Sequence, residues 1–213
     1  MAHCESKIIY PNVSLGKNVK IGEFVIIGLP PEGSEDENLE TIIGDNSIIR
    51  SHTVIYAGVT IGNHFNCGHG VKIREETFIG NYSQIGTNSQ VEGKVRIGNN
   101  VKMHTNVHIG QKSVIEDGVF IAPGTVLTNV YHPLCAKAKE CLKGPLIKEK
   151  SKIGANATIL PRVIIGANAL IGSGSVVTKD IPDNMVAAGN PAKVIKRIDE
   201  LNCPFNLMEG PYK

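Results

Sequence analysis

The chain of 213 residues contains no tryptophan, and only 5% of its residues are aromatic. No apolar run approaches the ~20 residues that a membrane helix needs. Residues 1–14 lack the apolar core and cleavage site of a secretory signal. Lys and Arg together number 22 against 20 Asp and Glu, so the net charge of +2 gives no case for nucleic-acid binding. We therefore expect a cytoplasmic protein without a membrane or nucleic-acid partner.

The five cysteines are an odd number and show no Cys-x-x-Cys spacing. Neither a disulfide framework nor a zinc ribbon fits this pattern, so we expect reduced thiols. Glycine is abundant, with 23 residues, and Asn, Ile and Val are common. This composition is typical of short strands joined by tight turns.

A period of six residues runs through most of the sequence. In fifteen consecutive hexads the same position holds an aliphatic or sulfur-containing residue: Ile43, Ile49, Ile55, Ile61, Cys67, Ile73, Ile79, Ile85, Val91, Ile97, Met103, Ile109, Ile115, Ile121 and Leu127. The same register occurs at residues 9–27 and returns at residues 153–177. Four residues after each aliphatic position comes a mostly small or β-branched residue, such as Ser47 or Val59. We expect both to point inward.

The residue before each small position is often Asn or Gly, as at Asn46 and Gly58. These residue types tolerate the positive φ of a tight corner. Phe65 occupies a small position, and the smaller Cys67 that follows it partly conserves the core volume. This pattern resembles the hexapeptide-repeat acyltransferase superfamily over residues 9–198. The resemblance implies a mostly β fold, a left-handed parallel β-helix of about eight coils of three hexads.

The repeat breaks in three places, and such breaks map to loops. We expect a β-helix domain over residues 1–190, with an acidic loop at 29–41 and a lysine-rich loop at 129–152. Pro191 suits the first turn of a helix. Residues 191–213 are therefore expected to form a short C-terminal capping helix and a tail.

The segment from Ile153 to Lys196 resembles the coenzyme A side of galactoside and maltose acetyltransferases. The resemblance implies that acetyl-CoA meets Ala155 and Ser173 with its pantetheine arm. It implies that the nucleotide end meets four further residues, which are Thr178, Lys179, Lys193 and Lys196. Lysines replace two of the family's arginines, which keeps the charge but loses bidentate geometry.

Two histidines are candidates for a catalytic base. His132-Pro133, five residues after Leu127, matches the spacing of the catalytic histidine in galactoside-type enzymes, and we rank it first. His104 is ranked second. It replaces Gln in a motif, here His104-Thr105-Asn106, that resembles enzymes acetylating amino sugars on nucleotide carriers.

The same resemblance extends to the stretch from Leu127 to Leu134, where His132 replaces Asn and Leu134 replaces Arg. It implies that the acceptor is bound around Asn106, Asn129 and Tyr131. A corner role is the alternative for Asn106. His64 and His69 imitate the five-residue spacing of zinc ligands in γ-class carbonic anhydrases, but their phase in the repeat differs by one. We expect no metal.

The sequence thus favours an acetyl-CoA-dependent sugar acetyltransferase that N-acetylates an amino sugar carried on a nucleotide. The alternatives are O-acetylation of a sugar hydroxyl, as in galactoside- and maltose-type enzymes, and a non-catalytic or zinc-dependent β-helix. The resemblance also implies a homotrimer with sites between subunits. Outward apolar residues such as Ile48, Phe78 and Phe120 are candidates for the subunit contact.

Overall fold

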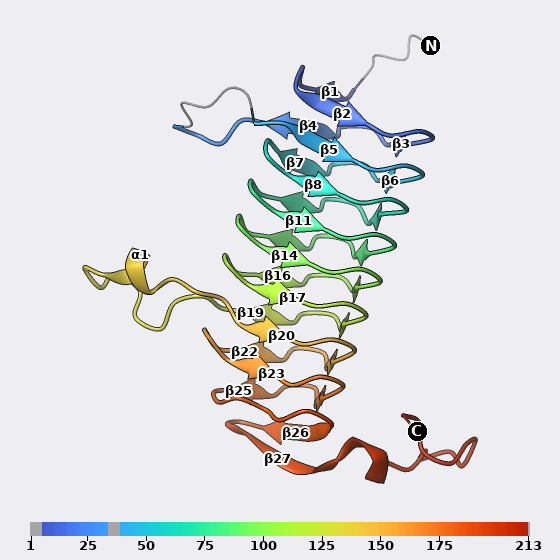
Figure 1. Cartoon of the computed structure of the whole chain (residues 1–213), viewed down its shortest axis with the longest axis vertical. Coiled ribbons are helices and arrows are strands. Elements are labelled where there is room, and N and C mark those ends of the chain that lie inside the picture. Colours follow the sequence, from blue (N-terminus) through green and yellow to red (C-terminus); the bar gives the residue numbers. More distant parts are fainter. Residues whose placement is uncertain (1–5, 34–38, 213) are drawn as a thin grey trace.

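A computed structural model describes residues 6–33 and 39–212. In these residues the chain winds into a tall column of stacked coils, with the N-terminal coil at one end and the C-terminal strands at the other (Figure 1). Each complete coil contributes one short strand to each of three sheets, which we name A, B and C, and these strands run parallel. The expected parallel β-helix of hexapeptide repeats is confirmed, and its left-handed sense is an expectation from the family resemblance.

Sheet A contains nine strands of the described chain. They are β1 (Ile8–Ile9), β4 (Ile26–Leu29), β7 (Val54–Tyr56), β10 (Lys72–Ile73), β13 (Gln90–Val91), β16 (His108–Ile109), β19 (Val126–Leu127), β22 (Thr158–Ile159) and β25 (Val176–Val177).

Sheet B contains eight strands within the same described ranges. They are β2 (Val13–Leu15), β5 (Thr41–Ile43), β8 (Thr60–Ile61), β11 (Phe78–Ile79), β14 (Arg96–Ile97), β17 (Val114–Ile115), β20 (Leu146–Ile147) and β23 (Ile164–Ile165).

Sheet C has ten strands in the part of the chain that the structure describes. They are β3 (Lys20–Ile21), β6 (Ile48–Ile49), β9 (Asn66–Cys67), β12 (Gln84–Ile85), β15 (Lys102–Met103), β18 (Phe120–Ile121), β21 (Lys152–Ile153), β24 (Leu170–Ile171), β26 (Met185–Gly189) and β27 (Ala192–Arg197).

The described residues form eight complete coils, and a partial ninth follows them. The ninth coil consists of β25, a single bridge between Ile165 and Ile181 in place of a sheet B strand, and β26. The column is therefore slightly longer than the eight coils expected.

The core is one continuous stack of inward side chains. Neighbouring coils are in register at 18 residues, so that Ile55, Ile73 and Val91 lie one above another. All fifteen repeat positions from Ile43 to Leu127 are buried, as predicted. Phe65 is fully buried and Cys67 is only 1% exposed, which confirms the expected compensation of volume. In the first coil, by contrast, Ile9 and Leu15 are each 39% exposed.

The corners need a left-handed backbone once per hexad. The predicted Asn and Gly corners, Asn46 and Gly58 among them, have positive φ. Residues of other types adopt the same conformation at equivalent positions, for example His52, His64 and Tyr82. The solenoid imposes this conformation because each corner is fixed by the coil above and the coil below.

Both inserted loops leave the column where sheet A meets sheet B. The first lies between β4 and β5, as predicted for 29–41, although residues 34–38 of it are outside the described part of the chain. The second contains the short helix α1 (Ala138–Cys141), which projects from the column (Figure 1). Its predicted end at residue 152 is wrong, because β20 already resumes the repeat at Leu146. Ile147 is buried six residues before Ile153 and is in phase with it.

The predicted capping helix is also wrong. Residues 192–197 form β27, which pairs antiparallel with β26 and covers its outer edge. A short 3₁₀ turn (Ile198–Glu200) follows. The β-branched pair Val194-Ile195 suits a strand, and an uncovered edge of β26 would leave a row of backbone groups unpaired. In residues 6–33 and 39–212, no helix has the length and apolarity to cross a membrane.

Candidate functional site

The three edges of the column differ in chemistry. We name the turns after sheet B strands the B–C edge and those after sheet C strands the C–A edge. The C–A edge carries, in order along the column, Glu23, Ser51, His69, Thr87, Thr105, Pro123, Ala155 and Ser173. Each of these residues lies two positions after the inward aliphatic residue of its coil.

The B–C edge is closed by a ladder of side chains. The backbone N–H of Asp45 donates to Oδ1 of Asn63 over 2.8 Å, and the N–H of Asn63 donates to Oδ1 of Asn81 over 2.8 Å. The N–H of Asn81 donates to Asn99 (2.9 Å), and that of Asn99 donates to Asp117 (2.7 Å). Each of these four backbone amides, which the turn itself leaves unpaired, is thus bonded by the next coil.

At the C–A edge the equivalent amides are open. In the described chain no side chain accepts a hydrogen bond from the backbone N–H of Ala155 or Ser173. The two residues lie one coil apart, because Ile153 of β21 pairs with Ile171 of β24. The carbonyl of Ala155 accepts the N–H of Gly174 over 2.7 Å, so only the amide side is available. These N–H groups can donate to a bound molecule.

A hollow of about 520 Å³ is lined by Ser173 and by Gly154, the residue before Ala155, and we name it the donor hollow. Its walls on sheet C are Phe120, Lys152 and Leu170, and Ser173 borders it at the edge. Tyr212 from the C-terminal tail closes one side, with Lys152 Nζ 4.8 Å from the centre of its ring. Partial burial lowers the pKa of Lys152, and the nearby charge of Lys150 lowers it further. Lys152 also donates to the side-chain oxygen of Asn168.

A second hollow of about 240 Å³ lies further along the same sheet, and we name it the acceptor hollow. Two side-chain amides, Asn66 and Gln84, line it together with the cations of Arg50 and Lys102. His104 lines its far end. Oδ1 of Asn66 has no hydrogen-bond partner in the described chain. This combination of amides, cations and an imidazole suits a ligand with hydroxyl or charged groups.

His104 connects the two hollows. Its ring lines the acceptor hollow and makes an edge contact with Phe120, a wall of the donor hollow, at 5.1 Å between ring centres. Two coils separate His104 from Gly154, or about 10 Å at the usual spacing of strands. Its partly exposed side chain therefore lies between the two hollows.

The structure does not bring His132 to His104 within one chain. His132, Tyr131 and Asn129 lie on the loop that leaves the A–B edge after β19, and both rings are exposed, with 6.3 Å between their centres. His104 lies on the C–A edge, on the other side of sheet A. Asn106 is an exposed corner residue with φ of 56°, which agrees with its alternative corner role.

The predicted nucleotide-end residues lie at the C-terminal end of the column but divide between two places. Thr178 and Lys179 follow β25 of sheet A. Lys193 and Lys196 lie on β27, which extends sheet C beyond the donor hollow. The lysines of β27 are thus on the sheet that carries Ser173, two strands further along.

The histidines of the zinc-like spacing have separate surroundings. His64 stacks on Tyr82 with 4.6 Å between ring centres, and Nδ1 of His69 is 2.7 Å from the Ser51 hydroxyl. Among the described residues no three His, Cys, Asp or Glu side chains are grouped as a metal site needs. Burial raises the pKa of the Cys67 thiol, which packs in the core.

Sequence reasoning missed Lys152 and Tyr212 in the donor hollow, and Arg50, Asn66 and Gln84 in the acceptor hollow. Outward positions precede each inward aliphatic residue, so the row Asn66, Gln84 and Lys102 can be read from the period. No sequence signal could have placed Tyr212, because the tail carries no repeat.

The fold and its open edge define a parallel β-helix protein of hexapeptide repeats. The family described as bacterial transferase hexapeptide (six repeats) matches residues 76–111, 94–129 and 144–179, and these matches stop on either side of the α1 loop. The chain belongs to this family.

A long match supports this assignment. The chain is 35% identical over 182 residues to a 2,3,4,5-tetrahydropyridine-2,6-dicarboxylate N-acetyltransferase of Alkaliphilus metalliredigens, covering 85% of this chain and 73% of that protein. A galactoside O-acetyltransferase of Escherichia coli is 44% identical over 90 residues, which are 40% of this chain and 44% of the relative. The chain spans less than half the length of the first curated relatives that it matches, 48, 44 and 42%.

A solved structure shares the fold over most of the chain. It is a UDP-N-acetylglucosamine acyltransferase from Campylobacter jejuni, with a TM-score of 0.75 and coverage of 90% of this chain and 73% of that one. The sequences are 20% identical, so this likeness concerns the architecture alone.

Proposed function

We propose that the protein is an acetyl-CoA-dependent acetyltransferase that N-acetylates an amino sugar carried on a nucleotide. The observation that carries the proposal is the position of His104 between two hollows on one face of the column. The names of the curated relatives, which are acetyltransferases, support the donor.

The donor hollow fits the arm of coenzyme A. Its apolar walls, Phe120 and Leu170, suit a flexible chain, and the open amides at Ala155 and Ser173 can donate to amide oxygens of pantetheine. The lysines of β27 lie further along the same sheet, where the charged phosphates would emerge. Coenzyme A would supply an acetyl thioester, whose thiolate is a good leaving group.

The reaction then needs a base for the incoming nucleophile. The amine attacks the thioester carbonyl, a C–N bond forms, and the C–S bond to coenzyme A breaks. We assign the departing proton to His104, because a neutral imidazole can accept it near pH 7. His132 is the alternative base, and it would reach this edge only from a neighbouring subunit.

O-acetylation is the second candidate function. The 44% identity with a galactoside O-acetyltransferase supports it, and the same hollows and base serve a hydroxyl as well as an amine.

The two reactions can be separated in one experiment. Purified protein is incubated with acetyl-CoA and a panel of nucleotide amino sugars, free amino sugars and galactosides, and released thiol is measured. An N-acetylated product survives mild alkali, whereas an acetate ester is cleaved. Thiol release with the nucleotide amino sugars and an alkali-stable product supports the proposal. Release with no member of the panel contradicts it.

We further propose a homotrimer with threefold symmetry. The outward apolar residues named from sequence fall on two different sheets, with Ile48 and Phe120 on C and Phe78 on B. Sheet B carries exposed apolar residues along its length, since Ile42 is 39%, Phe78 40% and Ile164 36% exposed. Light scattering at micromolar concentration should give a trimeric mass, and Phe78→Asp with Ile164→Asp should give monomers. A monomeric wild-type protein contradicts the proposal.

A further inference from the structure

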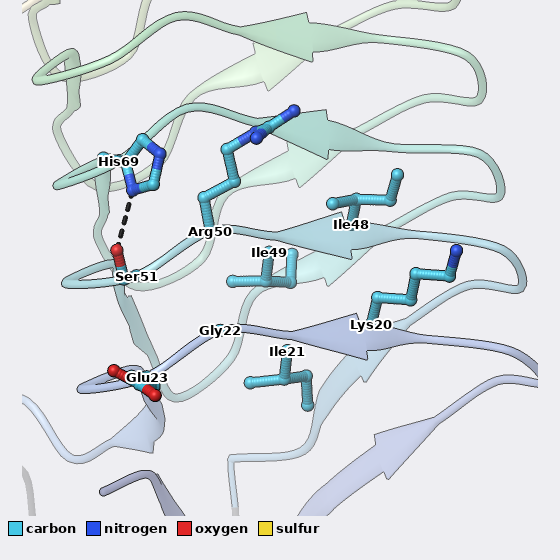
Figure 2. A pocket seen from close by; sticks show the side chains of 9 residues that line it. All are labelled: Lys20, Ile21, Gly22, Glu23, Ile48, Ile49, Arg50, Ser51 and His69. Carbon is cyan, nitrogen blue, oxygen red and sulfur yellow. Dashed lines mark hydrogen bonds between the residues drawn. The ribbon is translucent and has the colours of Figure 1, made fainter.

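A third hollow, of about 410 Å³, lies on sheet C beyond the acceptor hollow, and we name it the distal hollow. Strands β3 and β6 form its floor, and Lys20, Arg50 and His69 surround it (Figure 2). Arg50 lines both this hollow and the acceptor hollow. The distal, acceptor and donor hollows thus follow one another along the same sheet and the same C–A edge.

Arg50 differs from the other four arginines of the sequence. Arg74 pairs with Glu75 at 2.9 Å, and Arg197 pairs with Asp199 at 3.1 Å. The remaining two also have partners, since Arg96 lies 5.5 Å over the ring of Phe78 and Arg162 donates to the carbonyl of Cys141. Among the described residues, the Arg50 side chain makes no hydrogen bond, ion pair or ring contact. Its five donors are therefore available to a ligand.

The charge around Arg50 favours an anion. Lys20 and Arg50 contribute two cations, and the carboxylate of Glu23 is the acidic group on the wall. Figure 2 shows the Arg50 guanidinium extending away from Glu23, toward the coil that carries His69. Lys102, which shares the acceptor hollow with Arg50, adds a third cation. A planar guanidinium recognises phosphate and carboxylate groups through paired hydrogen bonds.

His69 also lines this wall. Its Nδ1 is 2.7 Å from the Ser51 hydroxyl, which fixes the orientation of the ring. When Ser51 donates this bond, Nε2 of the neutral ring carries the proton, and the ring's outer edge becomes a hydrogen-bond donor. Ser51 and His69 lie on successive coils, so their contact joins two neighbouring coils at the rim of the distal hollow.

We propose that the distal hollow binds an anionic group, phosphate or carboxylate, at the end of the acceptor remote from the acetylated atom. Arg50 binds the group, and Lys20 and His69 flank it. The proposal rests on the proposed function, because His104 defines the reacting end. Arg50 follows β6 and His104 follows β15, so three coils separate them, or about 14 Å. An acceptor that spans this distance carries its charge well away from the reacting nitrogen or oxygen.

Binding of simple anions tests the site without acetylation. Inorganic pyrophosphate, succinate and neutral methyl galactoside are titrated by calorimetry into the wild type, Arg50→Gln and Lys72→Gln. Lys72 lies on sheet A, so this variant removes the same unit charge elsewhere. We expect pyrophosphate or succinate to bind the wild type and Lys72→Gln equally, and Arg50→Gln about ten- to a hundred-fold more weakly. Arg50→Lys should retain part of the affinity.

Each outcome of these titrations either supports or overturns anion binding in the distal hollow. The anion that binds better identifies the charged group as phosphate or carboxylate. Equal anion affinity in Arg50→Gln and wild type, or binding of neither anion to the wild type, overturns the proposal. Thiol release from acetyl-CoA is measured separately. If neutral acceptors are acetylated but no anion binds, the anion site is wrong and the acetyltransferase remains. If anions bind through Arg50 but nothing is acetylated, the function is wrong and the site remains.

Discussion

Two edges of the same column are built from the same six-residue unit but differ in whether their backbone amides are hydrogen-bonded. The B–C edge satisfies its turn amides with the ladder that runs from Asp45 to Asp117. The C–A edge leaves the amides of Ala155 and Ser173 open and carries His104 and Arg50 beside three hollows. One position in each coil decides whether an edge is bonded or open, because an Asn or Asp two residues after the aliphatic position accepts the backbone N–H of the neighbouring turn. The repeat therefore builds the scaffold, and the residues that depart from it build the site.

The strongest way to break this comparison is to remove the proposed base, His104, from the open edge. His104→Ala should lower kcat about 10²- to 10⁴-fold and leave coenzyme A affinity unchanged, because only proton transfer is lost. Steady-state kinetics and calorimetry measure the two quantities. His132→Ala is the companion variant, and loss of kcat there with normal activity in His104→Ala assigns the base to the A–B loop.

A change in the shared core should damage both edges equally. Phe65 is fully buried and supports the coils beneath both edges. Phe65→Ala should lower the free energy of unfolding by about 3–5 kcal/mol through lost burial and a residual cavity. Urea denaturation followed by circular dichroism tests this. Phe24→Ala is the control, since Phe24 is 55% exposed, and an equal loss in the two variants would contradict the packing account.

The ladder of the closed edge should affect stability without affecting activity. Asn81 accepts from the N–H of Asn63 and donates its own N–H to Asn99. The Asn81 side chain also donates through Nδ2 to Oδ1 of Asn99 over 3.2 Å, so Asn81→Ala removes two side-chain hydrogen bonds. At about 0.5–1.5 kcal/mol for each bond, the variant should lower the free energy of unfolding by about 1–3 kcal/mol, with unchanged kcat and KM. Thr87 is on the open edge, also two residues after an inward aliphatic residue. Thr87→Ala should lower the free energy of unfolding by less than Asn81→Ala does. A larger cost for Thr87→Ala would remove the distinction between the edges.

The smallest effect is expected beyond the donor hollow, on β27. Lys193 is exposed and Lys196 is half-buried, and a charge contact at the surface contributes about 0.2–1 kcal/mol. Lys193→Ala with Lys196→Ala should therefore weaken coenzyme A binding from a few-fold to about ten-fold, with unchanged stability. Calorimetry at low and high salt measures this, and equal affinity in the double variant removes these lysines from the site.

The sequence predicted the core residue by residue, because every hexad places its aliphatic residue in the same environment. It failed where the repeat is interrupted. The hexad at Ile147 was hidden behind the α1 loop, and the strand at residues 192–197 was mistaken for a helix because Pro191 resembles a helix start. Family resemblance predicted roles for Ala155, Ser173 and His104 that stay predictions, whereas Arg50 carries no motif.

What the sequence by itself determined is the coil, since a strict period of six with Asn or Gly at the corners admits few other ways to bury the fifteen apolar residues from Ile43 to Leu127. Only the tertiary structure decided which residues meet. Strand pairing between successive coils makes residues 18 apart into neighbours. Arg50, Gln84 and His104 therefore share one hollow, although 54 positions separate the first from the last. It also decided that Tyr212 lies beside Lys152, a contact between the tail and sheet C that no local pattern encodes.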